Sequence, residues 1–399
     1  MIDYLNILKK NNICSKNDYY SVFVCIFACI PIINKIFCSV LPSLEGLLMF
    51  SLYAVSIVFF VLWLFFNLSN FRINIYHVAV IITILVCYFS TISRDVKSTE
   101  SMIELVVYVI FPFLFFPLSS INGILFVKIS MFVPVIGVFF LDKIFIVDLN
   151  SSIGMGTSYV FLLPIVSTII YFFKIKEKRT YLLLLGSLNF IYLYYVFLHG
   201  SRGTILCILL CFIFCFATKK NVNGGVTIKK LPFIVISLVI FFCFLFFFDL
   251  IFVLNDYLVS RDVHVGFLNK FIRLSYLGDL TNGRSLLTDL VVDGIKESPL
   301  VGHGVSSFMF YTGYLYPHNF ILQFFYDIGI PLTVFLIFLS LRGLYRWFLF
   351  ADDDKYVFFI VVFCSSVPAA FFSGDLWKST MLWLTISFLL CFNLKEVEK

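Results

Sequence analysis

Long apolar runs alternate with short polar segments along most of the chain. A transmembrane helix needs ~20 mostly apolar residues, with a range of ~17–25. The runs are continuous instead of alternating with a period of two, which favours helices over membrane-spanning strands. The pattern therefore predicts an all-α polytopic membrane protein with about twelve transmembrane helices. The twelve runs lie near residues 20–34, 44–67, 73–90, 102–118, 121–141, 157–173, 181–198, 202–217, 231–254, 318–340, 356–372 and 377–394.

Positive residues between the runs predict the orientation of the chain. Short cytoplasmic loops of membrane proteins are enriched in Lys and Arg. The clusters at 174–179 and 219–230 are the strongest such markers, and counting the runs outward from them places both termini in the cytoplasm. The polar stretch 1–19 precedes the first run, and no convincing small-x-small cleavage site follows it. We therefore expect a retained first span and not a cleaved signal peptide.

This orientation leaves one large external loop at 255–317, which is more polar than the rest of the chain. It separates residues 1–254, with helices one to nine, from residues 318–399, with helices ten to twelve. Between Ser285 and Ile295 the apolar residues recur at helical spacing. This spacing predicts a short amphipathic helix that lies on the membrane or on the protein.

Composition agrees with the pattern. Of 399 residues, 61% are hydrophobic and 13% are charged, and the mean hydropathy is +1.03. Soluble domains contain ~45–50% apolar and ~25% charged residues, so a soluble enzyme is excluded. The net charge of +6 is spread between apolar runs, with no basic stripe of the kind that binds nucleic acid. The 11 cysteines lie mostly inside apolar runs, where a thiol behaves as a small hydrophobe.

The first candidate for chemistry is Arg202, in the tight external connection His199–Gly203 between runs seven and eight. It lies at the start of a helix that enters the membrane from outside. Short external loops tend to avoid Arg, and Gly203 would let another backbone approach closely. The alternative is an ordinary flanking Arg whose side chain reaches the headgroups. We favour the functional interpretation for Arg202.

The second candidate is His318, followed by Asn319 at the external start of run ten. Runs eight and ten both enter from outside, so both present helix N-termini, which attract anions, at the external face. His318 could cap the helix, bind an anion or move a proton. A single interfacial His is more often a structural hydrogen-bonding group.

The third candidate is Arg284 in the large loop, followed by the glycine-containing stretch 298–304 that would allow tight turns near a ligand. Arg284 taken alone would more often be a solvated loop charge. Asp327, inside run ten, is an intramembrane carboxylate and a functional candidate, unless it pairs with a neighbouring polar group. The acidic triplet 352–354 is expected to be a solvated cytoplasmic loop.

Taken together, two arginines, one histidine and two helix N-termini would meet at the outer membrane–water interface. An Arg fork matches phosphate oxygens in a bidentate way. A lipid-linked diphosphate holds its phosphates at that depth, and its departure as a leaving group requires neutralisation of negative charge.

The same residues resemble the motifs of a known family. They are Ser201-Arg202-Gly203, Gly283-Arg284, the run Ser298-Pro299-Leu300-Val301-Gly302-His303-Gly304, the run His318-Asn319-Phe320-Ile321-Leu322-Gln323, and Gly329-Ile330. Their order and spacing around one large loop resemble the O-antigen polymerase and O-antigen ligase superfamily, which includes the Wzy-type polymerases. The resemblance covers roughly residues 154–331. No Trp follows Arg284, where many members have one.

The resemblance implies a GT-C-like glycosyltransferase that works without metal or cofactor. It implies transfer of a glycan from undecaprenyl diphosphate, with inversion, at the periplasmic face of the bacterial inner membrane. Arg202 and Arg284 are implied as catalytic residues that bind the diphosphate, and His318 as a catalytic or positioning residue. Ser201 and Asn319 complete the expected substrate-binding set.

The leading hypothesis is an O-antigen polymerase that acts on lipid-linked repeat units. An O-antigen ligase, with lipid A–core as acceptor, would use nearly the same site. A flippase for the lipid-linked oligosaccharide is an alternative of a different class, but the chain shows no clear internal repeat of the kind many transporters have. The expected partners are the undecaprenyl-diphosphate-linked oligosaccharide, membrane lipids, a chain-length regulator and a flippase.

Overall fold

The structure is a computed structural model that describes parts of the chain between residues 16 and 392. The described residues are 16–41, 43, 51–58, 60–61, 75–92, 102–103, 105–115, 121–141, 144, 158–175, 180–199, 202–221, 225–230, 232, 234–235, 247–261, 265–276, 284–314, 316–372 and 375–392. Much of the second and ninth predicted spans lies outside these residues.

The described chain is almost entirely helical. The helices are α2 (Lys16–Val40), α4 (Ile75–Ile92), η3 (Val106–Ile110), α6 (Phe111–Phe115), α7 (Gly123–Ser130), η4 (Val133–Phe140), α10 (Leu162–Lys174), α11 (Thr180–His199), α12 (Arg202–Ala217), α14 (Phe247–Val259), α15 (Gly266–Tyr276), α16 (Arg284–Glu297), α17 (Phe308–Thr312), α18 (Phe320–Ile328), α19 (Ile330–Phe350), α20 (Asp353–Ala370), η5 (Leu376–Lys378) and α21 (Thr380–Cys391). The described strands form one antiparallel pair, β1 (Thr218–Lys220) and β2 (Val226–Ile228), in which Lys219 faces Thr227.

The prediction of a helical membrane protein is confirmed at this level. Within the described ranges, three helical stretches are long and apolar enough to cross a membrane, namely Tyr20–Val40, Gly123–Phe140 and Ile330–Phe350. Shorter apolar helices accompany them, such as Leu182–Leu198 and Gly203–Ala217. The number of twelve spans and the GT-C-like fold stay predictions.

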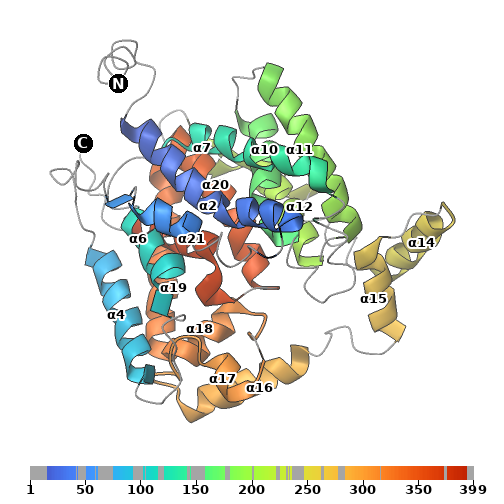
Figure 1. Cartoon of the computed structure of the whole chain (residues 1–399). Coiled ribbons are helices and arrows are strands. Elements are labelled where there is room, and N and C mark those ends of the chain that lie inside the picture. The colour runs from blue at the N-terminus through green and yellow to red at the C-terminus, as the bar shows by residue number, and fades with distance from the viewer. Residues whose placement is uncertain are drawn as a thin grey trace.

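Helix α20 lies at the centre of the fold. It packs against α7, α10, α12 and α21, and Figure 1 shows α2, α7, α10 and α12 gathered around it. Thirteen of the 18 residues of α20 are buried, including Phe358 and Phe359. Phe358 packs edge-to-face on Phe126 of α7, with ring centroids 4.9 Å apart. The connections at both ends of α20 are therefore held by a rigid element.

The acidic triplet forms the start of α20 instead of a loop, and Asp352 and Asp353 are exposed to solvent as expected. Asp352 caps the helix by accepting from the backbone N–H of Lys355, and Asp354 accepts from the N–H of Ile124 at 3.3 Å. Asp353 pairs with Lys220 of β1 at 2.8 Å. Negative side chains are favoured at a helix N-terminus because unpaired N–H groups point at them. The triplet joins α20 to its neighbours.

Predicted span ten is broken at Gly329, which corrects the expectation of one continuous helix. Gly329 has φ +79°, and a Cβ there would lie 2.5 Å from the carbonyl oxygen of Leu300, so only glycine fits. Phe324 of α18 and Leu336 of α19 line one small cavity although they lie twelve positions apart in the sequence. A straight helix would place them ~18 Å apart at ~1.5 Å per residue. The chain therefore changes direction at Gly329, between α18 and α19.

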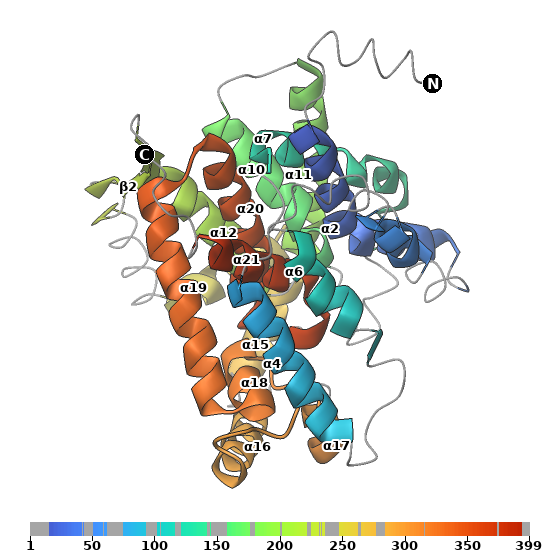
Figure 2. The same cartoon turned by 90° about the vertical axis from the view of Figure 1, so that its left-hand side faces the viewer.

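The predicted amphipathic helix is confirmed as α16, and it lies on the protein. Leu287 and Val291 form a small buried cluster with Phe308 and Tyr326. Gly294 lies directly against the Tyr326 ring. Figures 1 and 2 show α16 and α17 together beneath α18, at the opposite end of the molecule from α7 and α10. Arg284, the first residue of α16, is thereby held close to α18.

Candidate functional site

The start of α18 carries two of the predicted site residues. Asn319 is the N-cap, and its Oδ1 accepts from the backbone N–H groups of Ile321 and Leu322 at 3.0 and 3.3 Å. This contact gives Asn319 a structural role, and its contact with substrate stays a prediction. Beside it, His318 has φ +57°, a conformation uncommon outside glycine. Such backbone strain tends to persist where the surrounding structure requires it, as at functional sites.

The ring of His318 packs edge-to-face against Tyr316, with centroids 4.5 Å apart. Its Nδ1 atom is buried. The imidazole is therefore fixed by its backbone conformation and by an aromatic neighbour, as expected of a group that must point in one direction.

Arg284 reaches the connection between α20 and α21. Its Nη2 donates to the carbonyl oxygen of Phe372 at 2.9 Å. A guanidinium has five N–H donors in a planar fork, and this bond uses one of them. The bond to the backbone helps to orient the guanidinium group.

Helix α12 begins at Arg202, and its start meets the same connection. The structure describes the backbone of Arg202, whereas its side chain and Ser201 lie outside the described residues. A Cβ at the next residue, Gly203, would lie 2.7 Å from the Cβ of Phe372. The starts of α12 and α16 therefore both contact Phe372, which brings together two segments 82 residues apart in the sequence.

Sequence reasoning missed the part of the site that follows Phe372. We refer to Asp375–Ser379 as the α20–α21 turn. Asp375 accepts from Gln323 Nε2 at 2.9 Å, and Trp377 donates through Nε1 to Asp327 at 2.6 Å. Two buried side chains of α18, one helical turn apart, thus hold this turn. The only signal in the sequence is a short polar break between two apolar runs.

Asp327, the predicted intramembrane candidate, is fully buried and paired. It accepts from Ser307 Oγ at 3.2 Å as well as from Trp377. Its backbone carbonyl accepts from the N–H of Gly304 at 2.8 Å. These bonds join α18 to the α20–α21 turn and to the loop before α17, so Asp327 is a structural junction.

Gly302, in the 298–304 stretch, serves a close backbone contact. Gly302 has φ +73°, and a Cβ on it would lie 2.6 Å from the carbonyl carbon of Asp327. The N–H of His303 donates to the Tyr326 carbonyl at 2.8 Å, and the two rings stack with centroids 4.5 Å apart. This glycine contact locks α18 to the loop after α16.

A pocket of about 320 Å³ opens beside these residues. Its polar lining comes from the side chains that follow here. They are Tyr159, Tyr316, Ser365, Ser366, Asp375, Lys378, Ser379 and Thr380. Tyr316 contacts His318, and the Tyr159 hydroxyl lies against Gly203. The pocket therefore adjoins the starts of both α12 and α18, and it combines a carboxylate, an ammonium group and hydroxyls.

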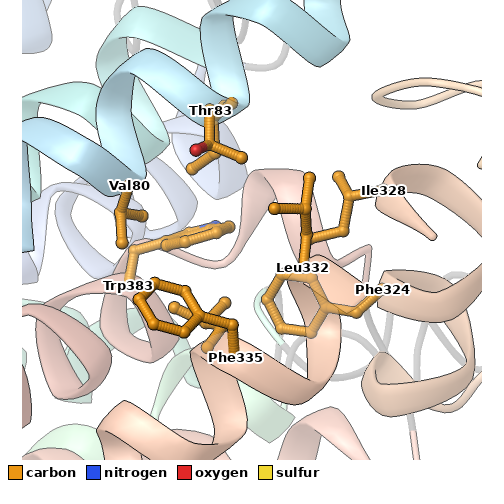
Figure 3. A pocket seen from close by; sticks show the side chains of 9 residues that line it. Val80, Thr83, Phe324, Ile328, Leu332, Phe335 and Trp383 are labelled. Carbon is orange, nitrogen blue, oxygen red and sulfur yellow. The ribbon is translucent and has the colours of Figure 1, made fainter. Parts of the chain in front are cut away.

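A second, mostly apolar cavity lies between α4, α18, α19 and α21. Figure 3 shows Val80 of α4, Phe324 of α18, Phe335 of α19 and Trp383 of α21 converging on it. Its volume is about 20 Å³, and its lining is mostly apolar. Trp383 also donates to the Leu376 carbonyl at 2.9 Å. The turn thus contributes Asp375 and Lys378 to the polar pocket, and its Trp377 stacks on Trp383 with ring centroids 5.5 Å apart.

Within the described residues, no group of three or more His, Cys, Asp and Glu side chains could hold a metal ion. The O-antigen ligase family model matches residues 187–337. This match supports the O-antigen ligase and polymerase superfamily for this part of the chain. No curated protein and no solved structure matches the chain. The resemblance seen in the sequence motifs is thereby confirmed.

The match to the O-antigen ligase family runs from α11 into α19 and includes Arg202, Arg284 and His318. Asp375 and Lys378 lie beyond its end, and Tyr159 lies before its start. The pocket is therefore built partly from the family region and partly from segments that pack around it.

Proposed function

We propose that the protein is an O-antigen polymerase that transfers a growing glycan from undecaprenyl diphosphate onto an incoming lipid-linked repeat unit. The family match supports a function of the ligase or polymerase type. The main supporting observation is that the starts of α12 and α16 both contact Phe372, beside a polar pocket that borders His318.

The two arginines would stabilise the leaving group. Breaking the bond between the anomeric carbon and the diphosphate leaves negative charge on the phosphate oxygens. Arg284, oriented by the Phe372 carbonyl, and Arg202, at the start of α12, would neutralise that charge. A guanidinium stays protonated and binds phosphate in a bidentate way, so Lys would not substitute fully.

His318 would act on the acceptor. A hydroxyl of the incoming sugar attacks the anomeric carbon while the imidazole takes its proton, and undecaprenyl diphosphate departs from the opposite face. The products are a lengthened lipid-linked glycan and free undecaprenyl diphosphate. Attack opposite the leaving group inverts the anomeric centre. A fixed ring position favours this role, because a general base must lie within hydrogen-bond reach of the proton.

The proposal includes the location. The protein would lie in the bacterial inner membrane with both termini in the cytoplasm and the site facing the periplasm. There it would take lipid-linked units from a flippase and work with a chain-length regulator.

Alanine replacements of Arg202, Arg284 and His318 test the assignment in a deletion strain that expresses each variant. We expect each variant to lose long polysaccharide chains at equal protein level. Arg261→Ala, at an exposed arginine just after α14, is the matched control and should keep them. Wild-type chain lengths in all three site variants would rule the assignment out.

A ligase is the second candidate, because the family model carries the description O-antigen ligase. The same site would then take lipid A–core as acceptor. Deletion separates the two functions, since loss of a polymerase leaves single-unit lipopolysaccharide and loss of a ligase leaves bare core. A flippase would fail to make polymer from lipid-linked units when purified, whereas a polymerase would make it.

A further inference from the structure

Gln323 is the residue through which α18 holds the α20–α21 turn. Its side chain is 2% exposed. Both ends of its amide are bonded to the turn: Nε2 donates to Asp375 Oδ1 at 2.9 Å, and Oε1 accepts from the N–H of Leu376 at 3.1 Å. Loss of these bonds would leave buried polar groups uncompensated, so they fix the turn firmly.

The turn is also part of the pocket wall. Asp375 and Lys378 line the pocket. The Oδ1 atom of Asp375 accepts from Gln323 and also from the N–H of Trp377, at 3.0 Å. His318 borders the same pocket through Tyr316 and directly precedes α18. One nine-residue helix therefore supports two walls of the pocket.

We propose that Gln323 is a positioning residue that sets Asp375 and Lys378 at the correct distance from His318 for the acceptor sugar to bind. This inference rests on the proposed function, in which the pocket receives the acceptor. Carboxylate, ammonium and hydroxyl groups suit the hydroxyls of a carbohydrate. Displacement of a bound reactant by ~1 Å costs on the order of 100-fold in rate, so a loosened wall should be visible in the kinetics.

Two replacements of Gln323 separate positioning from simple folding. Gln323→Ala removes both bonds. Gln323→Glu has the same shape and keeps the acceptor for Leu376, but it puts a carboxylate oxygen against Asp375. Two carboxylates at that distance share a proton, because like charges in contact raise the pKa of one partner. The nearby charged groups are Asp327 on α18, Lys378 on the turn and Arg284 at Phe372.

The first measurement is polymerisation by the purified full-length protein with lipid-linked repeat units, at pH 8 and pH 6. We expect Gln323→Ala to lower kcat/KM for the acceptor by about tenfold or more. Gln323→Glu should lower kcat/KM for the acceptor by a similar factor at pH 8. At pH 6 its kcat/KM, divided by the wild-type value at the same pH, should rise toward one. Asn269→Ala, an exposed amide on α15, is the control and should match wild type at both pH values.

The second measurement is hydrogen exchange of the same proteins, which does not depend on activity. Exchange of the Leu376 and Trp377 amides should be about tenfold faster in Gln323→Ala and unchanged in Asn269→Ala. Unchanged exchange in Gln323→Ala would overturn the anchoring. Faster exchange with wild-type kinetics, or a Gln323→Glu variant without pH-dependent recovery, would overturn the positioning role. Absence of polymer from the wild-type protein would refute the proposed reaction, and the exchange rates would still decide the anchoring.

Discussion

Replacement of Gly302 by alanine would separate the two backbones that meet at α18. Gly302 has φ +73°, and its position is closed by backbone atoms: a Cβ would lie 2.6 Å from the carbonyl carbon and oxygen of Asp327 and from the Gly329 nitrogen. Backbone atoms cannot rotate aside as a long side chain can. The new methyl group therefore forces the loop 298–304 away from α18.

The expected cost has two parts. A left-handed conformation costs a residue with a Cβ ~1–2 kcal/mol. Forcing an extra methyl group into a closed site adds ~1–3 kcal/mol. We therefore expect Gly302→Ala to lower the free energy of unfolding by about 2–5 kcal/mol.

Gly313 provides a matched control because it has nearly the same backbone angle, φ +75°, and a Cβ there would meet nothing within 4 Å. Gly313→Ala should lose only the conformational part, ~1–2 kcal/mol. The assay is equilibrium unfolding in mixed micelles, with polysaccharide chain length measured in parallel. Equal losses of stability in the two variants would refute the steric argument.

Three further outcomes follow from the site contacts. Trp377→Phe should lower the free energy of unfolding by ~1.5–3 kcal/mol, because the Asp327 carboxylate loses a donor at 2.6 Å. The control is Trp347→Phe, which removes an Nε1 donor to a backbone carbonyl at 3.2 Å. An equal or smaller loss of stability in Trp377→Phe than in Trp347→Phe would contradict the prediction. Asn319→Ala should cost ~1 kcal/mol through loss of the helix cap, and Asn319→Ser should restore most of it in the same melt. Arg284→Lys should leave the free energy of unfolding near wild type but shorten the polysaccharide chains, because an ammonium group cannot bind two phosphate oxygens as a fork. Full-length chains in this variant would count against diphosphate binding by Arg284.

Local patterns predicted the elements that depend on local sequence. The hydropathy run at 202–217 matches α12 in both bounds, and the apolar spacing after Ser285 gave the amphipathic helix α16. In both cases neighbouring residues decide the outcome. The motif residues Arg284, His318 and Asn319 were likewise visible in the sequence.

Long-range contacts decided what the sequence could not predict. The break at Gly329 depends on the close approach of Leu300. The hydropathy pattern does not contain this contact and predicts one continuous span. The role of the α20–α21 turn depends on Gln323 meeting Asp375, which is 52 residues away. No periodicity or charge pattern in the sequence indicates the contact between Gln323 and Asp375. The sequence therefore predicts no functional role for the α20–α21 turn.

The break between α18 and α19 bears on how membrane crossings are counted. The nine residues of α18 extend only ~14 Å at ~1.5 Å per residue, too short to cross a bilayer, so α18 leaves the parity of the crossings unchanged. The 21 residues of α19 extend ~32 Å at ~1.5 Å per residue, enough to cross a ~30 Å hydrocarbon core without help from α18. The predicted sidedness of every segment after α19 is therefore the same whether residues 318–340 form one helix or two.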